Sequence, residues 1–288
     1  MRAKDAGVTD GETPKASAPM RDLGQRIVSG VALAAVVLVA LWAGVLPFAV
    51  IVGAVGVVVA WEWGRIVRAQ GIDAILIIQA VAVAAGVLLA AWGLAGLGLL
   101  LVVVAAIISA LLAFGERGHM AAFGALYAGL PAISLVWFRY DATAGFLAVL
   151  FLLLAVWATD TGAYFAGRLI GGPKLIPRVS PNKTWSGLAG GIAAGSLVGL
   201  IFALVRPELF VAHMMIVGAV LGAVSQAGDL MESALKREYG VKDASALIPG
   251  HGGFMDRVDG LNAAVVAAAI FAVTVNIQAP ARALLGLN

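Results

Sequence analysis

Apolar runs alternate with short polar segments along almost the whole chain. A helix needs about 20 predominantly apolar residues to cross a bilayer, so repeated runs of about 18–22 residues predict a polytopic membrane protein. We expect an all-α integral membrane bundle of about nine transmembrane helices. The predicted spans are residues 27–44, 45–61, 74–92, 94–114, 120–138, 143–160, 186–205, 208–228 and 260–279.

Glycine and alanine are abundant within these runs, as in the segment GLAGGIAAGS that begins at Gly187. Small residues let membrane helices approach closely, which favours a compact bundle. Any single glycine fits a lipid-facing position equally well. We expect three regions: a disordered cytoplasmic tail over residues 1–26, N-terminal transmembrane helices over 27–142, and a C-terminal transmembrane catalytic region over 143–288. The tail does not match the pattern of a signal peptide, because its polar region is too long and a full-length span follows it.

Lysine and arginine are distributed unequally between the segments that join the spans. With a cytoplasmic N-terminus, 16 of the 19 lysines and arginines fall on the cytoplasmic side, and only Arg139, Arg206 and Arg282 fall on the other. Membrane proteins carry their excess of these residues in cytoplasmic loops. The distribution therefore predicts a cytoplasmic N-terminus and an external C-terminus.

Composition supports the same class of protein and removes several chemistries. The chain is 62% hydrophobic with a mean hydropathy of +1.01, against about 45–50% apolar residues in soluble domains. It contains no cysteine, which excludes disulfides, thiolate zinc sites and cysteine nucleophiles. Only 12% of residues are charged, yet ten of the 35 charged residues lie between Gly228 and Gly260. This concentration points to a functional segment.

Five polar residues in that segment recur at spacings of three and four. If the eighth span continues as a helix, they share one broad face at its cytoplasmic end. Carboxylates and cations on one face can hold a divalent metal and a phosphate together, although ordinary ion pairs at an exposed helix end give the same pattern. The residues are Asp229, Glu232, Ser233, Lys236 and Arg237.

A glycine-rich loop and two further aspartates complete the segment. Gly252 and Gly253 follow His251, and such glycines allow positive φ angles and a close backbone approach to a ligand. Asp256 and Asp259 then stand three apart at the start of the last span. Carboxylates with few nitrogen donors suit Mg²⁺, whereas N-capping is the structural alternative.

A second polar cluster lies at the end of the sixth span and in the segment after it. Asp160, Tyr164 and Arg168 stand four apart on one predicted helix face, and a carboxylate near a membrane boundary is a functional candidate. The next segment offers hydroxyl, amide and ammonium groups for a phosphate or a nucleobase, or alternatively forms an interhelical turn that caps the seventh span. Its residues are Ser180, Asn182, Lys183 and Thr184.

These residues also carry a resemblance. The run from Ser233 to Asp259 closely resembles the signature of the phosphatidate cytidylyltransferases, the CDP-diacylglycerol synthases. The D-[ST]-x-A-Y-x-x-G-R pattern at Asp160–Arg168 and the S-P-x-K-T pattern at Ser180–Thr184 resemble further family features. The resemblance covers roughly residues 155–265. The matching signature residues are Ser233, Lys236, Arg237, Lys242, Asp243, His251, Gly252, Gly253, Asp256, Arg257 and Asp259.

The resemblance implies transfer of CMP from CTP to phosphatidate, giving CDP-diacylglycerol and pyrophosphate, with Mg²⁺ and with a second metal or a monovalent cation left open. It further implies the bacterial cytoplasmic (inner) membrane, and CTP, phosphatidate and membrane lipids as partners, without nucleic acid. The distribution of lysine and arginine places both polar motifs, and hence the expected active site, on the cytoplasmic side. Small-residue-rich helices leave room for a homodimer. A lipid phosphate monoester is largely dianionic at neutral pH, so the reaction needs charge neutralisation and alignment more than a strong base.

Residue roles follow from the resemblance. Asp229 and Asp256 are expected to hold the metal, with Asp259 as a third ligand or a supporting group. The catalytic set adds Lys236 and Arg237, which with Arg257 would bind the phosphates of CTP or phosphatidate. His251 and its glycines would shape the nucleotide phosphate site. The remaining expected substrate-binding residues are Asp160, Tyr164, Arg168, Ser180, Asn182, Lys183, Thr184, Ser233, Lys242 and Asp243.

Two other functions compete with this one. Intramembrane carboxylates also mark ion and proton pathways in transporters, but a transporter predicts charges in the middle of spans and an internal repeat. A CTP-using polyprenol or phytol kinase is the nearer rival. Such a kinase would release CDP in place of pyrophosphate, so product analysis separates the two enzymes.

Overall fold

The computed structural model describes residues 19–69, 71–115, 118–248 and 252–287. Most of the expected tail, residues 1–18, therefore lies outside the described residues, as does His251. Helix α1 begins at Pro19, so the part of the expected tail from residue 19 to residue 26 is helical. The first helix thus starts earlier than the apolar run alone indicates.

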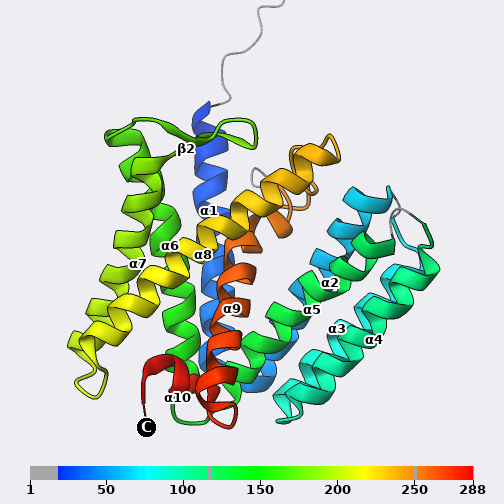
Figure 1. Cartoon of the computed structure of the whole chain (residues 1–288), viewed down its shortest axis with the longest axis horizontal. Coiled ribbons are helices and arrows are strands. Elements are labelled where there is room, and N and C mark those ends of the chain that lie inside the picture. The colour runs from blue at the N-terminus through cyan, green and yellow to red at the C-terminus, as the bar shows by residue number, and fades with distance from the viewer. Residues whose placement is uncertain (1–18, 70, 116–117, 249–251, 288) are drawn as a thin grey trace, which may run out of the picture.

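Ten helices and one short hairpin make up the described residues (Figure 1). The elements in chain order are α1 (Pro19–Ala43), α2 (Val45–Arg68), α3 (Ala74–Ala91), α4 (Ala95–Leu112), α5 (Gly118–Tyr140), α6 (Gly145–Leu169), β1 (Lys174–Ile176), β2 (Ser180–Thr184), α7 (Trp185–Val205), α8 (Val211–Glu238), α9 (Met255–Asn276) and α10 (Pro280–Leu285).

The helical membrane architecture is confirmed. Within the described residues, the eight helices from α2 to α9 are long and apolar enough to cross a membrane, and α1 adds a shorter apolar stretch, Val28–Ala43. Each predicted span corresponds to one of these nine helices. Several helices continue past the predicted boundary at the polar end: α2 to Arg68, α6 to Leu169 and α8 to Glu238. An apolar run predicts only the part of a helix that lies in lipid. The backbone hydrogen bonds of these helices continue into the polar residues that follow the run.

Glycines let α7 and α8 approach each other closely. Gly187, Gly191, Gly195 and Gly199 form the buried stripe of α7. A Cβ built on Gly195 would lie 2.6 Å from the carbonyl oxygen of Gly218 on α8, so only glycine fits this crossing. The expected role of small residues in packing the bundle is therefore seen at this crossing.

A two-stranded antiparallel hairpin, β1–β2, lies between α6 and α7, where the sequence analysis predicted no strand and left an interhelical turn as the structural alternative. Lys174 pairs with Thr184, and Ile176 pairs with Ser180. Thr184 then caps α7, because its hydroxyl accepts a hydrogen bond from the Gly187 amide at 3.1 Å. The capping alternative is confirmed for Thr184, and the strands supply the rigid connection that precedes it.

The polar segments gather at one end of the bundle. Figure 1 shows the start of α1, the hairpin and the C-terminal end of α8 at the same end, with α10 at the opposite end. Helices α2 to α5 pack on one another, α6 to α8 form a second group, and α9 contacts both α8 and α5. The start of α9 therefore lies where the two groups meet.

Candidate active site

An ion pair joins the two polar motifs. Lys183, on β2, places its Nζ 2.7 Å from Oδ2 of Asp229 on α8 and 3.4 Å from the carbonyl oxygen of Gln226. The Ser233 hydroxyl donates to the other oxygen of Asp229 at 3.3 Å. The side chains of Lys183 and Asp229 are 20% and 35% exposed, so this pair remains accessible to a substrate.

Two further aspartates, from two other helices, lie near the Asp229 of this pair. Asp160 of α6, Asp229 of α8 and Asp259 of α9 are close enough to interact electrostatically with one another. Lys183 and Arg257 supply positive charge to Asp160. The mutual repulsion of the carboxylates favours a bound cation or a cationic side chain between them.

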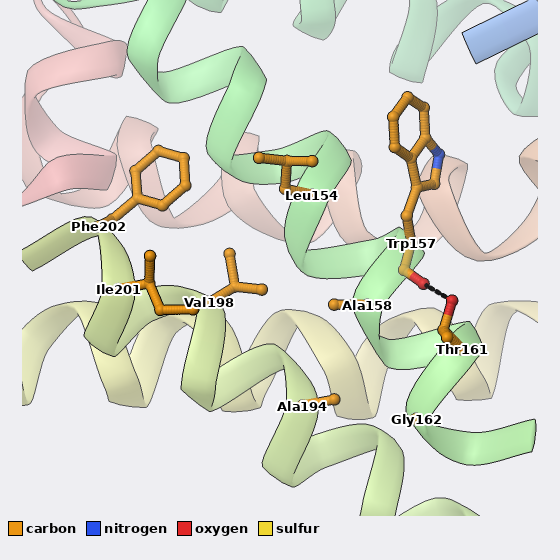
Figure 2. Close-up of a pocket in the computed structure, with 9 residues that line it drawn as sticks. All are labelled: Leu154, Trp157, Ala158, Thr161, Gly162, Ala194, Val198, Ile201 and Phe202. Atoms are coloured by element: carbon orange, nitrogen blue, oxygen red, sulfur yellow. Dashed lines mark hydrogen bonds between the residues drawn. The ribbon is translucent and has the colours of Figure 1, made fainter. Parts of the chain in front are cut away.

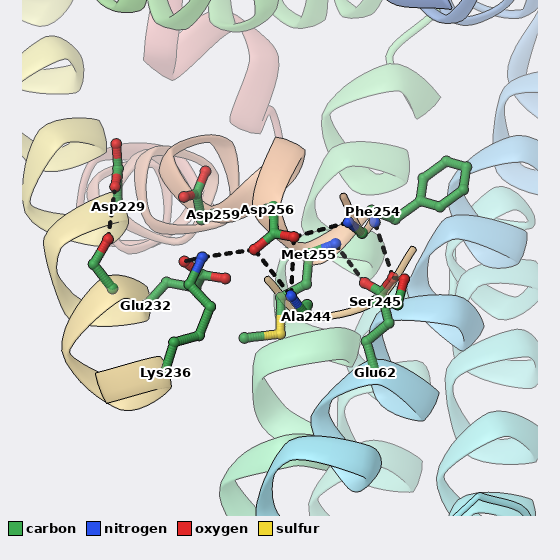
Figure 3. A network of polar contacts seen from close by, with 12 residues as sticks. Glu62, Asp229, Glu232, Lys236, Ala244, Ser245, Phe254, Met255, Asp256 and Asp259 are labelled. Atoms are coloured by element: carbon green, nitrogen blue, oxygen red, sulfur yellow. Dashed lines mark hydrogen bonds and ion pairs between the residues drawn. The ribbon is translucent and has the colours of Figure 1, made fainter. Parts of the chain in front are cut away.

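A second ion-paired cluster lies one turn further along α8. Lys236 Nζ lies 2.7 Å from Oε2 of Glu232 and 2.6 Å from Oδ1 of Asp256 (Figure 3). Glu232 is 1% exposed and Asp256 is 6% exposed. Among the described residues, neither oxygen of Glu232 accepts a well-aligned hydrogen bond, so Lys236 is its charge partner in this cluster. Losing that lysine would leave two buried carboxylates together.

Backbone amides hold Asp256 from the loop that precedes it. The amides of Ala244 and Gly253 donate to its Oδ2 at 3.0 and 2.8 Å. Gly252 has a φ of +82°, and a Cβ there would lie 2.8 Å from the same oxygen. Glycine is therefore favoured here, as expected, because the backbone is left-handed and passes close to the Asp256 carboxylate.

The sequence interpretation missed one acidic residue. Glu62, on α2, is fully buried and accepts hydrogen bonds from the Ser245 hydroxyl and from the amides of Phe254 and Met255 (Figure 3). The predicted second span ended at residue 61, immediately before it. A carboxylate flanked by two tryptophans at the end of an apolar run was the signal that could have revealed it.

The other predicted site residues differ in exposure. Tyr164 and Arg168 are exposed and pair with each other, because Arg168 donates to the tyrosine oxygen at 2.9 Å. Thr184 is buried as a helix cap. His251 lies outside the described residues. The remaining predicted residues are exposed or half-buried: Ser180, Asn182, Arg237, Lys242, Asp243 and Arg257.

The donor set around the site consists of carboxylate oxygens. Among the described residues, no three His, Asp or Glu side chains converge as a closed metal site. Mg²⁺ commonly takes one or two carboxylates and completes its coordination with waters and substrate phosphates. Carboxylates arranged in this way therefore fit an ion shared with a phosphate better than an ion enclosed by protein.

An apolar cavity borders the α6 segment that carries Asp160. It has a volume of about 460 Å³ and lies between α6 and α7, with Thr161 and Gly162 at one end and Phe202 at the other (Figure 2). A second cavity of about 320 Å³ is lined by Trp63, Tyr127 and Glu232. Apolar space therefore lies beside both charged clusters.

Comparison with known proteins decides the family. The family model described as the cytidylyltransferase family matches residues 24–275. The chain belongs to the cytidylyltransferase family. Both the Lys183–Asp229 pair and the Lys236–Asp256 pair lie inside the part that matches this family.

Curated relatives carry a more specific name. A phosphatidate cytidylyltransferase of Brucella suis biovar 1 is 40% identical over 88% of this chain and 94% of its own length. That of Bacillus subtilis is 34% identical over 83% of this chain and 94% of its own length. That of Haemophilus influenzae is 43% identical over 48% of this chain and 50% of its own length. The expected family resemblance is confirmed, and for the first two relatives it extends well beyond residues 155–265.

Proposed function

We propose that this protein is a phosphatidate cytidylyltransferase that transfers CMP from CTP to phosphatidate. The observation that carries the proposal is the family match over residues 24–275, together with relatives of that name aligned along nearly their whole length. The charged clusters supply the chemistry that this reaction needs, at the end of a membrane bundle where a water-soluble nucleotide and a lipid can meet.

The reaction is a phosphoryl-centred substitution. A phosphate oxygen of phosphatidate forms a bond to the α-phosphorus of CTP, the bond between that phosphorus and the α–β bridging oxygen breaks, and pyrophosphate leaves with the electron pair. Two highly anionic substrates must approach each other, so charge neutralisation and in-line alignment dominate the barrier. Lys183, Lys236 and Arg257 are the cations near the acidic clusters.

Each of these cations has a role within the proposed reaction. Lys183 lies on the hairpin and its side chain is partly exposed, so it would leave Asp229 for a CTP phosphate. Lys236 is held between two carboxylates and would orient Asp256 while it faces the substrates. The exposed residues Arg168 and Arg237 would bind the outer phosphates or the lipid head group.

Mg²⁺ is the proposed cofactor. Asp229 and Asp256 would hold it, and Asp259 would act as a third ligand or as a supporting group. When bound, Mg²⁺ would neutralise charge on the transferring and leaving phosphates. The chain's own contribution is to hold the carboxylates in place, which Ser233 does for Asp229 and the amides of Ala244 and Gly253 do for Asp256.

The membrane setting completes the proposal. We place the active site on the cytoplasmic side of the bacterial inner membrane, because 16 of the 19 lysines and arginines fall on that side of the nine-span arrangement. The apolar cavity beside Asp160 suits an acyl chain of phosphatidate, because its lining is hydrophobic and it opens next to the charged end of α6. The homodimer that small-residue helices allow stays a prediction.

The decisive experiment follows both products at once. Purified protein in lipid–detergent micelles receives phosphatidate, Mg²⁺ and CTP, and pyrophosphate is measured together with cytidine in the lipid fraction. We expect equal amounts of both, and loss of both in Asp256→Asn. Glu208→Gln, which changes an exposed carboxylate paired with Arg206 in the loop before α8, should keep full activity.

Three outcomes would contradict the proposal. Release of CDP without lipid-bound cytidine would make the protein a CTP-dependent lipid kinase. Binding of CTP without any reaction would mean that the site serves another use. Full activity of Asp256→Asn at ordinary Mg²⁺ would remove the proposed metal role of that residue.

A further inference from the structure

Glu62 is a buried carboxylate that lies on the N-terminal group of helices and contacts the catalytic segment. It is fully buried near the end of α2, far in sequence from the charged clusters. All of its described hydrogen-bond donors belong to the loop that joins α8 to α9 and to the start of α9. A buried charge without partners is very costly, so these contacts fix where the loop can lie.

Residues that donate hydrogen bonds to Glu62 are sequence neighbours of residues that donate to Asp256. At the near end of the loop, the Ala244 amide donates to Asp256 and the Ser245 hydroxyl donates to Glu62. At the far end, the Gly253 amide donates to Asp256 and the Phe254 amide donates to Glu62 at 3.0 Å. The two carboxylates therefore clamp the same loop at both of its ends.

Glu62 also completes the start of α9. The first amides of a helix have no acceptor within it, and the amides of Phe254 and Met255 donate to Glu62 at 3.0 and 2.6 Å. A negative group at this end is additionally favoured by the helix dipole. Asp256 is the next residue of the same turn, so the direction of its side chain depends on how this first turn is held.

Gly253 shows how closely the loop approaches Glu62. A Cβ on this residue would overlap the Glu62 carboxylate and would lie 3.0 Å from Cβ of Ala244. Glycine is therefore required here for contact with Glu62, in addition to the backbone freedom that the sequence suggested. Gly253, a residue of the signature, therefore has a steric partner on α2, which lies outside the signature.

We propose that Glu62 is a positioning residue that holds Ser245 and the start of α9 at Phe254 and Met255, and thereby orients Asp256 for metal and CTP. The inference rests on the proposed function for its catalytic consequence, but the contact itself can be tested without activity. All three described donors to Glu62 lie within residues 245–255, so we assign it no contact with a reacting atom and expect it to act through Asp256.

Hydrogen–deuterium exchange of the unliganded protein in micelles tests the positional claim. Glu62→Gln keeps the size of the side chain but replaces one acceptor oxygen with an NH₂ donor, so we expect faster exchange in peptides covering residues 244–258. The matched control is Gln79→Leu, because Gln79 is equally buried but donates to Ser109 and to the Ala121 carbonyl, within the N-terminal helices. Gln79→Leu should leave exchange in residues 244–258 unchanged.

Kinetics then test the catalytic consequence. In Glu62→Gln the Mg²⁺ concentration for half-maximal activity should rise about 10- to 100-fold, which is the usual effect of removing a group that orients a metal ligand. The KM for phosphatidate should stay within about twofold of wild type. Ser245→Ala removes one of the three donors and should shift the Mg²⁺ dependence in the same direction by less, which keeps the test available if Glu62→Gln does not fold.

The outcomes separate this inference from the proposed function. Unchanged exchange in residues 244–258, or an equal rise throughout α3 and α4, would overturn the positional claim. Faster loop exchange with an unchanged Mg²⁺ dependence would overturn the orientation of Asp256. If wild-type protein makes no CDP-diacylglycerol, the proposed function fails while the exchange result still decides the role of Glu62 in holding the loop.

Discussion

The Lys183–Asp229 pair places a cation and a carboxylate side by side at the candidate site. Each group is partly exposed, and their charged atoms are 2.7 Å apart. Exposed ion pairs contribute little to stability, typically less than about 1 kcal/mol. We propose that this pair keeps a cation and a carboxylate ready for an anionic substrate, and a substitution at Lys183 tests that role.

Lys183→Met should reduce kcat/KM for CTP by about 10²- to 10³-fold, because a positioned donor to the transition state is removed. The thermal unfolding midpoint should change little, since the pair is partly solvated. Lys174→Met is the control: it removes the same charge from an exposed position on the paired strand of the hairpin. Equal losses in the two variants would attribute the effect to general surface charge.

The contribution of Asp73 to the stability of the fold should depend on pH. Partial burial alone would raise its pKa, but hydrogen bonds from Arg68 and the Leu76 amide, with the Arg68 charge, lower the pKa below its ordinary value of 3.8. Its stabilising effect is therefore complete above the unfolded-state value and is lost as the pH falls through the lower folded-state value.

Asp73→Ala should lower stability near neutral pH by about 1 kcal/mol, because α3 loses its N-cap. Asp73→Asn keeps a capping oxygen and should lose less, while the acid-dependent part disappears. Unfolding midpoints in micelles, measured from pH 3 to pH 7, check both statements. A wild-type midpoint whose pH dependence is unaffected by Asp73→Asn would contradict the assignment of that dependence to this carboxyl group.

At the level of elements, the sequence reveals what is local and misses what depends on tertiary contact. The i, i+4 spacing of Glu232 and Lys236 indicated a shared helix face, and the two form an ion pair at 2.7 Å. The pairing of Lys183 with Asp229 could not be read from spacing, because it depends on how the hairpin folds over α8. Glu62 was missed because an apolar run predicts only the part of a helix that lies in lipid. The contact of the polar end of α2 with the loop before α9 is a tertiary contact that this pattern does not predict.

The crossing of α7 and α8 links this packing to the site. Gly195→Val should force the helices apart at Gly218, which costs about 1–3 kcal/mol and lowers the unfolding midpoint. Activity should fall as well, because α7 follows the strand that carries Lys183 and α8 carries Asp229. Ala193→Val, at an exposed position of the same helix, is the control and should alter neither property. Equal effects of the two variants on stability and activity would mean that the close approach at Gly195 is not required for either property.

At the scale of the whole molecule, the helices hold the parts of the candidate active site together at one end of the bundle (Figure 1). The carboxylates come from α6, α8 and α9, the hairpin supplies Lys183, and α2 supplies Glu62. These elements meet at the end of the bundle from which α1 starts, opposite α10 (Figure 1). Apolar surfaces set the helices in lipid, and the distribution of lysine and arginine chooses which end faces the cytoplasm.

That choice can be tested directly, because the natural chain contains no cysteine. Arg178→Cys places a thiol on the exposed turn of the hairpin, and Gln278→Cys places one on the exposed segment between α9 and α10. A membrane-impermeant maleimide should label Arg178→Cys in inverted membrane vesicles and Gln278→Cys in right-side-out spheroplasts. The reverse pattern would place the active site outside, away from cytoplasmic CTP. Labelling of both positions from one side would mean an even number of crossings between them and would contradict the arrangement of α7, α8 and α9 as three spans.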